Sequence, residues 1–453
     1  MDYKTLYAKT PPTRLFFKAA VPGSIGMLAS SIYQLVDGML VGQILGNTAF
    51  AALNLAMPFV IINFALADLI GVGSSVSISI RLGEKNEKEA CNLFTCASLM
   101  ILGAAVLIGA LLFFAAPLFM RLMGADAELT ALAVQYLRVY AVFSPLTTIL
   151  FAVDNYLRIC GKIRTSMALN IFMAAMCAFL EFLFLYVFRF GIWGAALGTC
   201  ISMSLTTLIA FYPFFRGRLA LKFCRPRFNA RSIRKTLSCG CPVFLNNVAG
   251  RVASILMNTI LLQLGGDSAV SVYGILMYVD GFIQPLLYGM CDSLQPAVGF
   301  NWGAKDYRRV TAIEKRCFTA SAVLSLVFSA VIFFFPAQVA GLFTQGGETG
   351  LLQMAVPAVT LFSATYVTRW ISFASQSFMA AIEKPLLASV ISVMTVLGFP
   401  VLLILAFWPL GLTGLWLNLP GTALLSAVLS VIILVGIRRQ LHDGKEKGDE
   451  NEY

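Results

Sequence analysis

The sequence predicts an all-α polytopic membrane protein, with twelve transmembrane helices in two pseudo-symmetric six-helix bundles around a central cleft. First, 59% of its 453 residues are hydrophobic and only 12% are charged, whereas soluble domains have about 25% charged residues. Second, apolar runs of about 20 residues recur along the chain, each long enough to cross a hydrocarbon core of roughly 30 Å. The runs are continuous, which excludes the alternating pattern of a membrane barrel. Third, landmarks recur at a constant offset of 220 residues.

Turn residues and charges divide the apolar runs into twelve spans. The predicted limits are 15–44, 49–80, 91–116, 130–156, 163–189, 192–214, 236–264, 268–300, 310–337, 350–380, 385–408 and 411–437.

The basic residues predict the orientation in the membrane. All but five of the 33 Lys and Arg residues lie in the two tails, in the segments after every second span, or within the first two turns of a span that follows such a segment. The exceptions are Arg121, Arg138, Arg189, Arg251 and Arg369. The positive-inside rule then places both termini in the cytoplasm and the protein in the cytoplasmic (inner) membrane. Because the net charge of +11 resides in short loops, it does not indicate a nucleic-acid partner.

A duplication organises the chain. Residues 1–215 are predicted to form an N-terminal lobe, 216–235 a basic cytoplasmic linker, 236–437 a C-terminal lobe, and 438–453 a polar, disordered cytoplasmic tail. Residues that match across the linker include Pro22 and Pro242, Gln43 and Gln263, Gly46 and Gly266, Met57 and Met277, Gly83 and Gly303, Lys85 and Lys305, Gly191 and Gly411, and Gly194 and Gly414. Six spans per half give the lobes the same orientation, a parallel repeat that is typical of transporters.

Three oxygen-bearing side chains fall at one depth in the outer half of the N-terminal lobe. Asp37 and Glu181 each lie nine residues before the residue near which their span leaves the outer face, Gly46 and Phe190 respectively, which is about 13 Å at 1.5 Å per residue. Thr199 lies eight residues after Gly191, near which its span re-enters, about 12 Å deep. A carboxylate in hydrocarbon costs roughly 2.5–3.5 kcal/mol, so it favours a functional role.

Ordered motifs resemble the multidrug and toxic compound extrusion (MATE) family over nearly the whole chain. They are "VPGSIGMLASSIYQLVDGMLVGQILG", "GVGSSVSISIRLG", "NYLRICGK", "FGIWGAALGT" and "LQPAVGFNWGAKD". The resemblance implies a twelve-helix, two-lobe antiporter that exports organic cations and other drugs in exchange for sodium or protons. The wider superfamily also contains flippases for lipid-linked oligosaccharides.

The resemblance also implies a cation site in the N-terminal lobe. The aspartate and threonine that the family uses match Asp37 and Thr199, and Glu181 takes the place of a second acid. Cys177 stands where the family has an asparagine. A thiol is a poor ligand for a hard cation, so we expect proton coupling rather than sodium bound by Asp37, Glu181 and Thr199. Protonation of the acid pair from outside would then expel the bound cargo.

Other polar residues are candidates for the substrate cleft. Asn155 matches a family position in the fourth span, and Tyr33 and Gln34 lie one turn before Asp37. Arg251 and Asp280 fall at similar depths in the C-terminal lobe, which permits a buried ion pair.

Charges elsewhere in the spans have structural interpretations. Asp154 and Arg158 are expected to form a surface ion pair, since they lie four residues apart on one helix. Asp68 and Asp292 are expected near the inner ends of their spans, as gates or anchors. Arg369 has no partner at its predicted depth.

The histidine and cysteine content argues against a metal site and against an enzyme. The single histidine, His442, lies in the polar tail, and no cysteine spacing indicates a metal. We therefore expect no cofactor other than a transported proton or sodium ion, and a monomer whose cargo is a small cationic or amphipathic molecule. One alternative is a flippase or exporter for a lipid-linked oligosaccharide or cell-envelope precursor. A membrane enzyme is less favoured, because no catalytic motif is present.

Overall fold

The computed structural model describes residues 3–123, 126–343 and 349–449, which contain helices and connecting turns but no strand. The helices are η1 (Thr5–Lys9), α1 (Pro12–Leu45), α2 (Asn47–Gly83), α3 (Glu87–Leu122), α4 (Ala127–Ile159), α5 (Ile163–Phe182), η2 (Leu183–Val187), α6 (Ile192–Phe215), α7 (Ala230–Gly303), α8 (Tyr307–Phe334), α9 (Pro336–Gly341), α10 (Thr349–Ser363), α11 (Thr365–Ala381), α12 (Pro385–Val393), η3 (Met394–Gly398), α13 (Phe399–Phe407), η4 (Trp408–Leu410) and α14 (Gly411–Asp449).

These helices account for twelve membrane crossings. Nine helical segments in the described ranges are long and apolar enough to span a bilayer, and α10 with α11 forms a tenth, bent by 47°. Two of the nine cross twice: α7 has 74 residues and turns at Gly266, and the segment Pro385–Ile437 has 53 residues and turns at Gly411. The predicted fold class is therefore confirmed.

Two features differ from the spans and linker that the sequence predicts. The tenth span breaks between α10 and α11, where the Ser329 and Ser325 hydroxyls of α8 donate to the carbonyls of Ser363 and Tyr366 at 2.8 and 2.6 Å. These bonds satisfy backbone groups that a broken helix would otherwise leave exposed to lipid. The linker ends earlier than predicted, because α7 begins at Ala230.

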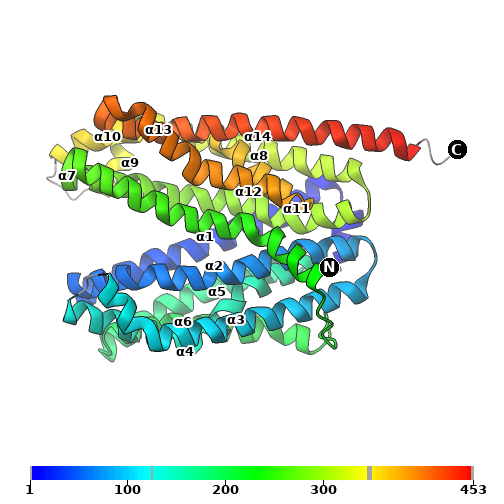
Figure 1. The fold of residues 1–453 in the computed structure, drawn as a ribbon, viewed down its shortest axis with the longest axis horizontal. Helices are drawn as coiled ribbons and strands as arrows, with labels where there is room; N and C mark the ends of the chain where they lie inside the picture. Colours follow the sequence, from blue (N-terminus) through cyan, green and yellow to red (C-terminus); the bar gives the residue numbers. More distant parts are fainter. Residues whose placement is uncertain (1–2, 124–125, 344–348, 450–453) are drawn as a thin grey trace.

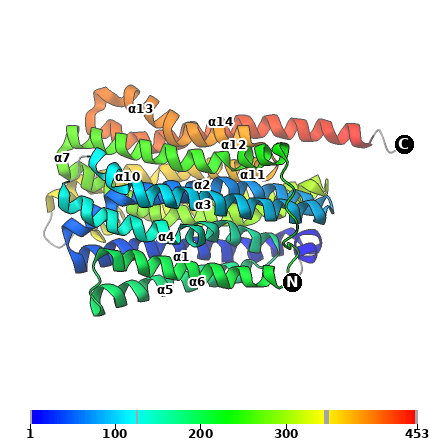
Figure 2. The same ribbon diagram turned by 60° about the horizontal axis from the view of Figure 1, so that its bottom comes forward.

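The disordered tail was a wrong prediction for most of its length. Helix α14 continues through residues 438–449 and extends beyond the rest of the bundle (Figure 2). The last four residues, 450–453, lie outside the described ranges. Lys and Glu favour helix, so a polar segment that follows an apolar helix can prolong it.

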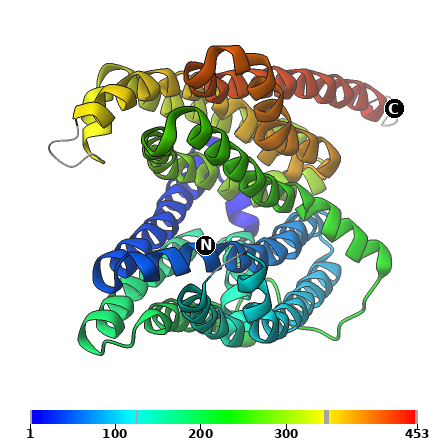
Figure 3. The same ribbon diagram turned by 60° about the vertical axis from the view of Figure 1, so that its left-hand side comes forward.

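Two groups of helices make up the molecule, the N-terminal lobe (α1–α6) and the C-terminal lobe (α7–α14), as Figures 1 and 3 show. The turns reflect the repeat. Gly46 and Gly266 have φ angles of 86° and 63°, and Gly191 and Gly411 have 74° and 57°. Only glycine adopts these left-handed angles without strain, which explains why both halves carry it at these turns.

The lobes meet through glycines at one end of the bundle, where the turns 84–86, 160–162 and 304–306 each carry a lysine; we call it the basic end. A Cβ built on Gly83 would lie 2.0 Å from the Phe300 carbonyl oxygen, and one on Gly303 would lie 2.2 Å from the Ile80 carbonyl oxygen. Phe300 and Gly303 are the 220-residue counterparts of Ile80 and Gly83. The contact is thus self-complementary about the pseudo-two-fold axis, like the interface of a symmetric dimer.

Further along the same junction, glycine again lets backbones touch. A Cβ on Gly73 would lie 1.9 Å from the Thr236 carbonyl oxygen, and one on Gly23 would lie 2.6 Å from the Gly289 carbonyl oxygen. Small residues that allow this approach are the usual means of close helix packing in membranes.

The N-terminal segment ties both lobes together at the basic end, where Figure 1 places the N-terminus. The Tyr7 hydroxyl donates to the Arg158 carbonyl of the N-terminal lobe, and burial raises the pKa of this phenol, which keeps it a donor. The Tyr7 carbonyl accepts from Asn301 at 3.2 Å and Arg309 at 2.8 Å, both in the C-terminal lobe. Tyr3 donates to Glu87 at 3.0 Å. This segment, residues 3–10, is here called the N-terminal strap.

Candidate functional site

Two acidic side chains are buried in the N-terminal lobe on adjacent helices. Asp37 of α1 is 3% exposed and Glu181 of α5 is 0% exposed. The two carboxyl groups lie close enough to interact directly. Depth alone predicts that they lie at one level, and the structure shows that both are buried on helices that pack against each other.

Glu181 is held by donors from its own helix and from α6. Its Oε1 accepts from Cys177 Sγ at 3.0 Å and from Thr199 Oγ1, and the Cys177 and Thr199 side chains lie 3.3 Å apart. Gly198 makes room for this contact, since a Cβ there would lie 3.1 Å from Glu181 Cγ. The structure therefore brings together all four residues of the predicted coupling site.

Oxygens in this pocket remain available for a proton or a cation. Asp37 Oδ1 and Glu181 Oε2 are buried and have no hydrogen-bond partner among the described residues. Buried polar atoms usually find a partner, so each orphan needs an explanation such as a functional role. Two neighbouring carboxyl groups cannot both be ionised in a low-dielectric pocket without a large cost. A shared proton or a bound cation would remove that cost.

Sequence reasoning missed one member of the pocket. Tyr136 of α4 is fully buried in the apolar cluster that contains Val41, one turn after Asp37, and Cys200, next to Thr199. Its hydroxyl has no hydrogen-bond partner among the described residues. Its ring packs against Tyr140 at 5.1 Å. The signal was present: Tyr136 lies nine residues after the start of α4 at Ala127, the depth of the two acids.

The predicted cleft residues of the N-terminal lobe occupy different environments. Tyr33 is buried in an apolar cluster with Cys177 and Met203, one turn from Asp37. Gln34 is exposed. Asn155 is half-buried and donates to the Phe151 carbonyl of its own helix at 3.2 Å, so its side-chain amide does not join the acid pair.

In the C-terminal lobe the expected pairing of Arg251 with Asp280 is wrong. Asp280 is paired with Arg369 through two contacts of 2.9 and 3.2 Å, and it also accepts from Tyr366 at 2.6 Å. Arg251 is exposed and forms no ion pair with a described residue. The bend between α10 and α11 explains the error, because a straight-helix count overestimates the depth of Arg369.

The expected surface pair of Asp154 and Arg158 is also wrong in its location. The ion pair exists at 2.5 Å, but Arg158 is only 4% exposed and reaches across the lobe junction to Ser293 Oγ at 3.3 Å. It thus binds α4 to α7.

The acids expected near the inner ends lie at the same junction. Asp292 accepts from Gln295 at 2.8 Å and from Ser377 at 3.2 Å. Asp68 of the N-terminal lobe interacts with it electrostatically. The basic end is therefore closed by the glycine contacts and by the hydrogen bond from Arg158 to Ser293.

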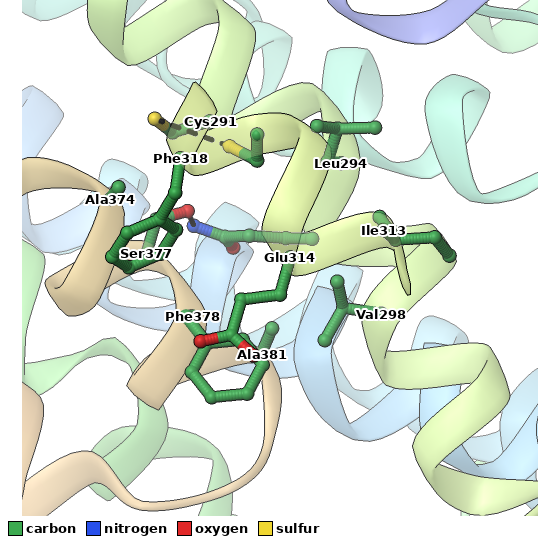
Figure 4. Close-up of a pocket in the computed structure, with 12 residues that line it drawn as sticks. Cys291, Leu294, Val298, Ile313, Glu314, Phe318, Ala374, Ser377, Phe378 and Ala381 are labelled. Carbon is green, nitrogen blue, oxygen red and sulfur yellow. Dashed lines mark hydrogen bonds between the residues drawn. The ribbon is translucent and has the colours of Figure 1, made fainter. Parts of the chain in front are cut away.

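A small cavity in the C-terminal lobe lies between α7, α8 and α11 (Figure 4). Its volume of about 20 Å³ holds about one water molecule. The Cys291 and Cys317 sulfurs lie 3.7 Å apart on its wall, and Glu314 lies beside Phe378 and Ala381. This volume is too small for an organic substrate. In the described part of the chain, no cluster of His, Cys, Asp or Glu could hold a metal ion.

Comparison with known proteins agrees with this architecture. The profile of the MatE family matches residues 22–187 and 242–404. The multidrug export protein MepA of Staphylococcus aureus is 24% identical over 442 residues, covering 96% of each chain.

Solved structures share the fold. MATE in complex with MaL6 superposes with a TM-score of 0.92 at 22% identity, covering 98% of this chain and 99% of the other. A MOP superfamily transporter from Pyrococcus furiosus, described as having a binding pocket of reverse polarity, superposes with a TM-score of 0.89 at 22% identity over 97% of this chain and 98% of that one. The chain belongs to the MatE family of multidrug and toxic compound extrusion proteins, which are membrane transporters and not enzymes.

Proposed function

We propose that this protein exports organic cations across the cytoplasmic membrane in exchange for protons. The observation that carries the proposal is the buried pair of Asp37 and Glu181, with one unpartnered oxygen on each carboxyl group among the described residues. The similarity to MepA, a multidrug export protein, supports a small-molecule cargo.

The pocket chemistry favours a proton over sodium. A sodium site would need several oxygens that converge on one point, but Cys177 contributes sulfur and uses its proton to bond Glu181. Thiols are poor ligands for hard cations. A proton needs only one carboxyl oxygen and leaves the bonds to Thr199 and Cys177 in place. Sodium held by Asp37, Glu181 and Thr199 is the alternative that the transport assay must exclude.

Helix α1 offers a route from the acid pair to the lobe junction. It carries Asp37 in its outer half and Gly23 at the junction with α7. Protonation would remove the mutual repulsion of the two carboxyl groups and let α1 pack closer to α5. The ionised pair would instead attract a cationic substrate into the cleft. Exchange of the proton for the cationic substrate would thus change how α1 packs against both lobes.

The described conformation is closed at the basic end, which we place in the cytoplasm by the positive-inside rule. The strap, the glycine contacts and the Arg158–Ser293 bond would all separate when the lobes rock to admit cargo from inside. We further propose that the protein acts as a monomer and that Tyr33 and Gln34 line the cargo route. Asp280 offers no net charge to cargo, because Arg369 neutralises it.

The flippase alternative is less favoured by the same geometry. A pyrophosphate-bearing substrate would need unpaired cations within the spans. Arg369 and Arg158 are both paired, which leaves Arg138 and Arg251 as candidates.

Transport into proteoliposomes tests the proposal. Purified protein is reconstituted, and uptake or efflux of a fluorescent organic cation is followed with a pH gradient or a sodium gradient imposed separately. We expect transport with the pH gradient alone, and its loss in Asp37→Asn. The matched control is Asp267→Asn, an exposed acid at the opposite end from the basic turns. Transport driven by sodium alone would overturn proton coupling.

A further inference from the structure

A groove opens between the first turns of α1 and α5 at the basic end, away from the acid pair. Its volume is about 660 Å³, and three basic side chains line it: Arg14, Lys18 and Arg164. Phe17, Val21 and Pro22 line the same groove. We propose that this groove binds an anionic phospholipid, with the phosphate headgroup on the basic residues and an acyl chain along the apolar ones.

Charge complementarity supports an anion. No acidic residue lines the groove, so Arg14 and Arg164 meet no counter-charge on its walls. Arg14 and Lys18 lie four residues apart on α1 and so share one face. Arg164 is the second residue of α5, and neither helix begins with a side-chain cap. The first backbone N–H groups of both helices therefore add to the positive potential.

The order of residues along α1 favours a lipid over a free anion. Phe17 is 60% exposed and Val21 is 47% exposed. From Arg14 to Val21 the helix advances about 10 Å towards the hydrocarbon. The basic residues would thus lie at headgroup level while the apolar ones face the first part of an acyl chain. Basic pockets between spans at the cytoplasmic face are the usual binding sites for anionic headgroups.

The groove also lies between two helices that carry residues of the proposed coupling site. It joins α1 and α5, the two helices that carry Asp37 and Glu181 at their other ends. Arg316 of the C-terminal lobe donates to Thr13, beside the groove, at 2.7 Å. A lipid in the groove would therefore brace α1 against α5 where α1 also touches the second lobe.

Native mass spectrometry of the full-length protein tests the assignment with phosphatidylglycerol and phosphatidylcholine as probes. We expect the wild-type protein to retain one phosphatidylglycerol, and Arg14→Gln/Arg164→Gln to bind it about 30-fold more weakly, at about 1 kcal/mol per basic residue near an anionic surface. The matched control is Arg231→Gln/Arg234→Gln, which removes two exposed arginines from the start of α7.

Each outcome decides the proposal. Selective loss of phosphatidylglycerol in the groove variant, with an unchanged melting temperature, supports it. Equal loss in the control variant would show a general charge effect and overturn it. Displacement of the lipid by millimolar inorganic phosphate would overturn the acyl-chain contact. If the double variant does not fold, Arg164→Gln alone carries the test, with an expected loss of about fivefold.

Discussion

Replacing Gly83 by alanine tests how closely the lobes must approach. The new Cβ would lie 2.0 Å from the Phe300 carbonyl oxygen and 2.9 Å from its carbon. Because both atoms are backbone, no side-chain rotation relieves the overlap, and α2 must move away from α7. Overpacking of this kind costs about 1–3 kcal/mol, so we expect the equilibrium to shift away from the closed basic end by about 5- to 150-fold.

Hydrogen exchange measures this shift. When the lobes separate at the basic end, the strap amides, including the Thr10 N–H that donates to Thr5, should exchange faster by the same factor. The control is Gly103→Ala on α3, where a new Cβ meets no atom within 4 Å. If strap exchange in Gly83→Ala equals that in Gly103→Ala, the glycines do not set the closure and the reasoning fails.

Three further perturbations test separate parts of the structure. Arg369→Ala should lower the free energy of unfolding by about 3–5 kcal/mol, because Asp280 would remain buried without its partner. In thermal unfolding, the double variant Asp280→Asn/Arg369→Gln should recover most of this lost stability, because it leaves no buried charge unpaired. Thr199→Val removes a hydrogen bond to a carboxyl group that is worth about 1.5–3 kcal/mol when charged, and should slow dye efflux. Tyr7→Phe removes the hydrogen bond from the N-terminal strap to the Arg158 carbonyl. Because such a bond is worth about 1 kcal/mol, hydrogen exchange of the strap amides should become about 5-fold faster.

Matched controls exist for each change. Arg138→Ala removes a cation that lies over the Phe113 ring and forms no ion pair with a described residue. Thr259→Val removes an exposed hydroxyl that bonds its own helix. Tyr212→Phe removes an exposed phenol. A control as damaging as its partner would contradict the role assigned to the buried contact.

Hydropathy predicts the spans because the bilayer fixes how long an apolar helix must be. The break at Ser363 could not be predicted in the same way. No proline or glycine stands at the break, and Pro357 lies six residues earlier. The broken backbone is satisfied by Ser325 and Ser329, which belong to another helix, so the sequence of the span itself carries little sign of it.

The repeat is the strongest signal in the chain because it constrains both turns and packing. Paired glycines at constant offset predict paired turns, which the φ angles of Gly46 and Gly266 confirm. The offset alone did not show that Gly83 and Gly303 face each other's helices. That requires knowledge of how the lobes dock, which no local pattern encodes.

Depth counting predicts height in the membrane but not direction around a helix. It found Asp37, Glu181 and Thr199, which do converge. The same method paired Arg251 with Asp280 wrongly, since two residues at one height can point apart. Burial and hydrogen-bond partners in the structure show in which direction each side chain points. Burial also adds Tyr136 to the pocket.

Proton release on substrate binding tests the central claim most directly. Purified protein in weakly buffered solution near neutral pH, with a pH indicator, is mixed with an organic cation. If the Asp37–Glu181 pair exchanges a proton for cargo, about one proton per bound cation should appear, and none should appear in Asp37→Asn/Glu181→Gln. Binding of the cation by wild-type protein with no proton released would contradict the account.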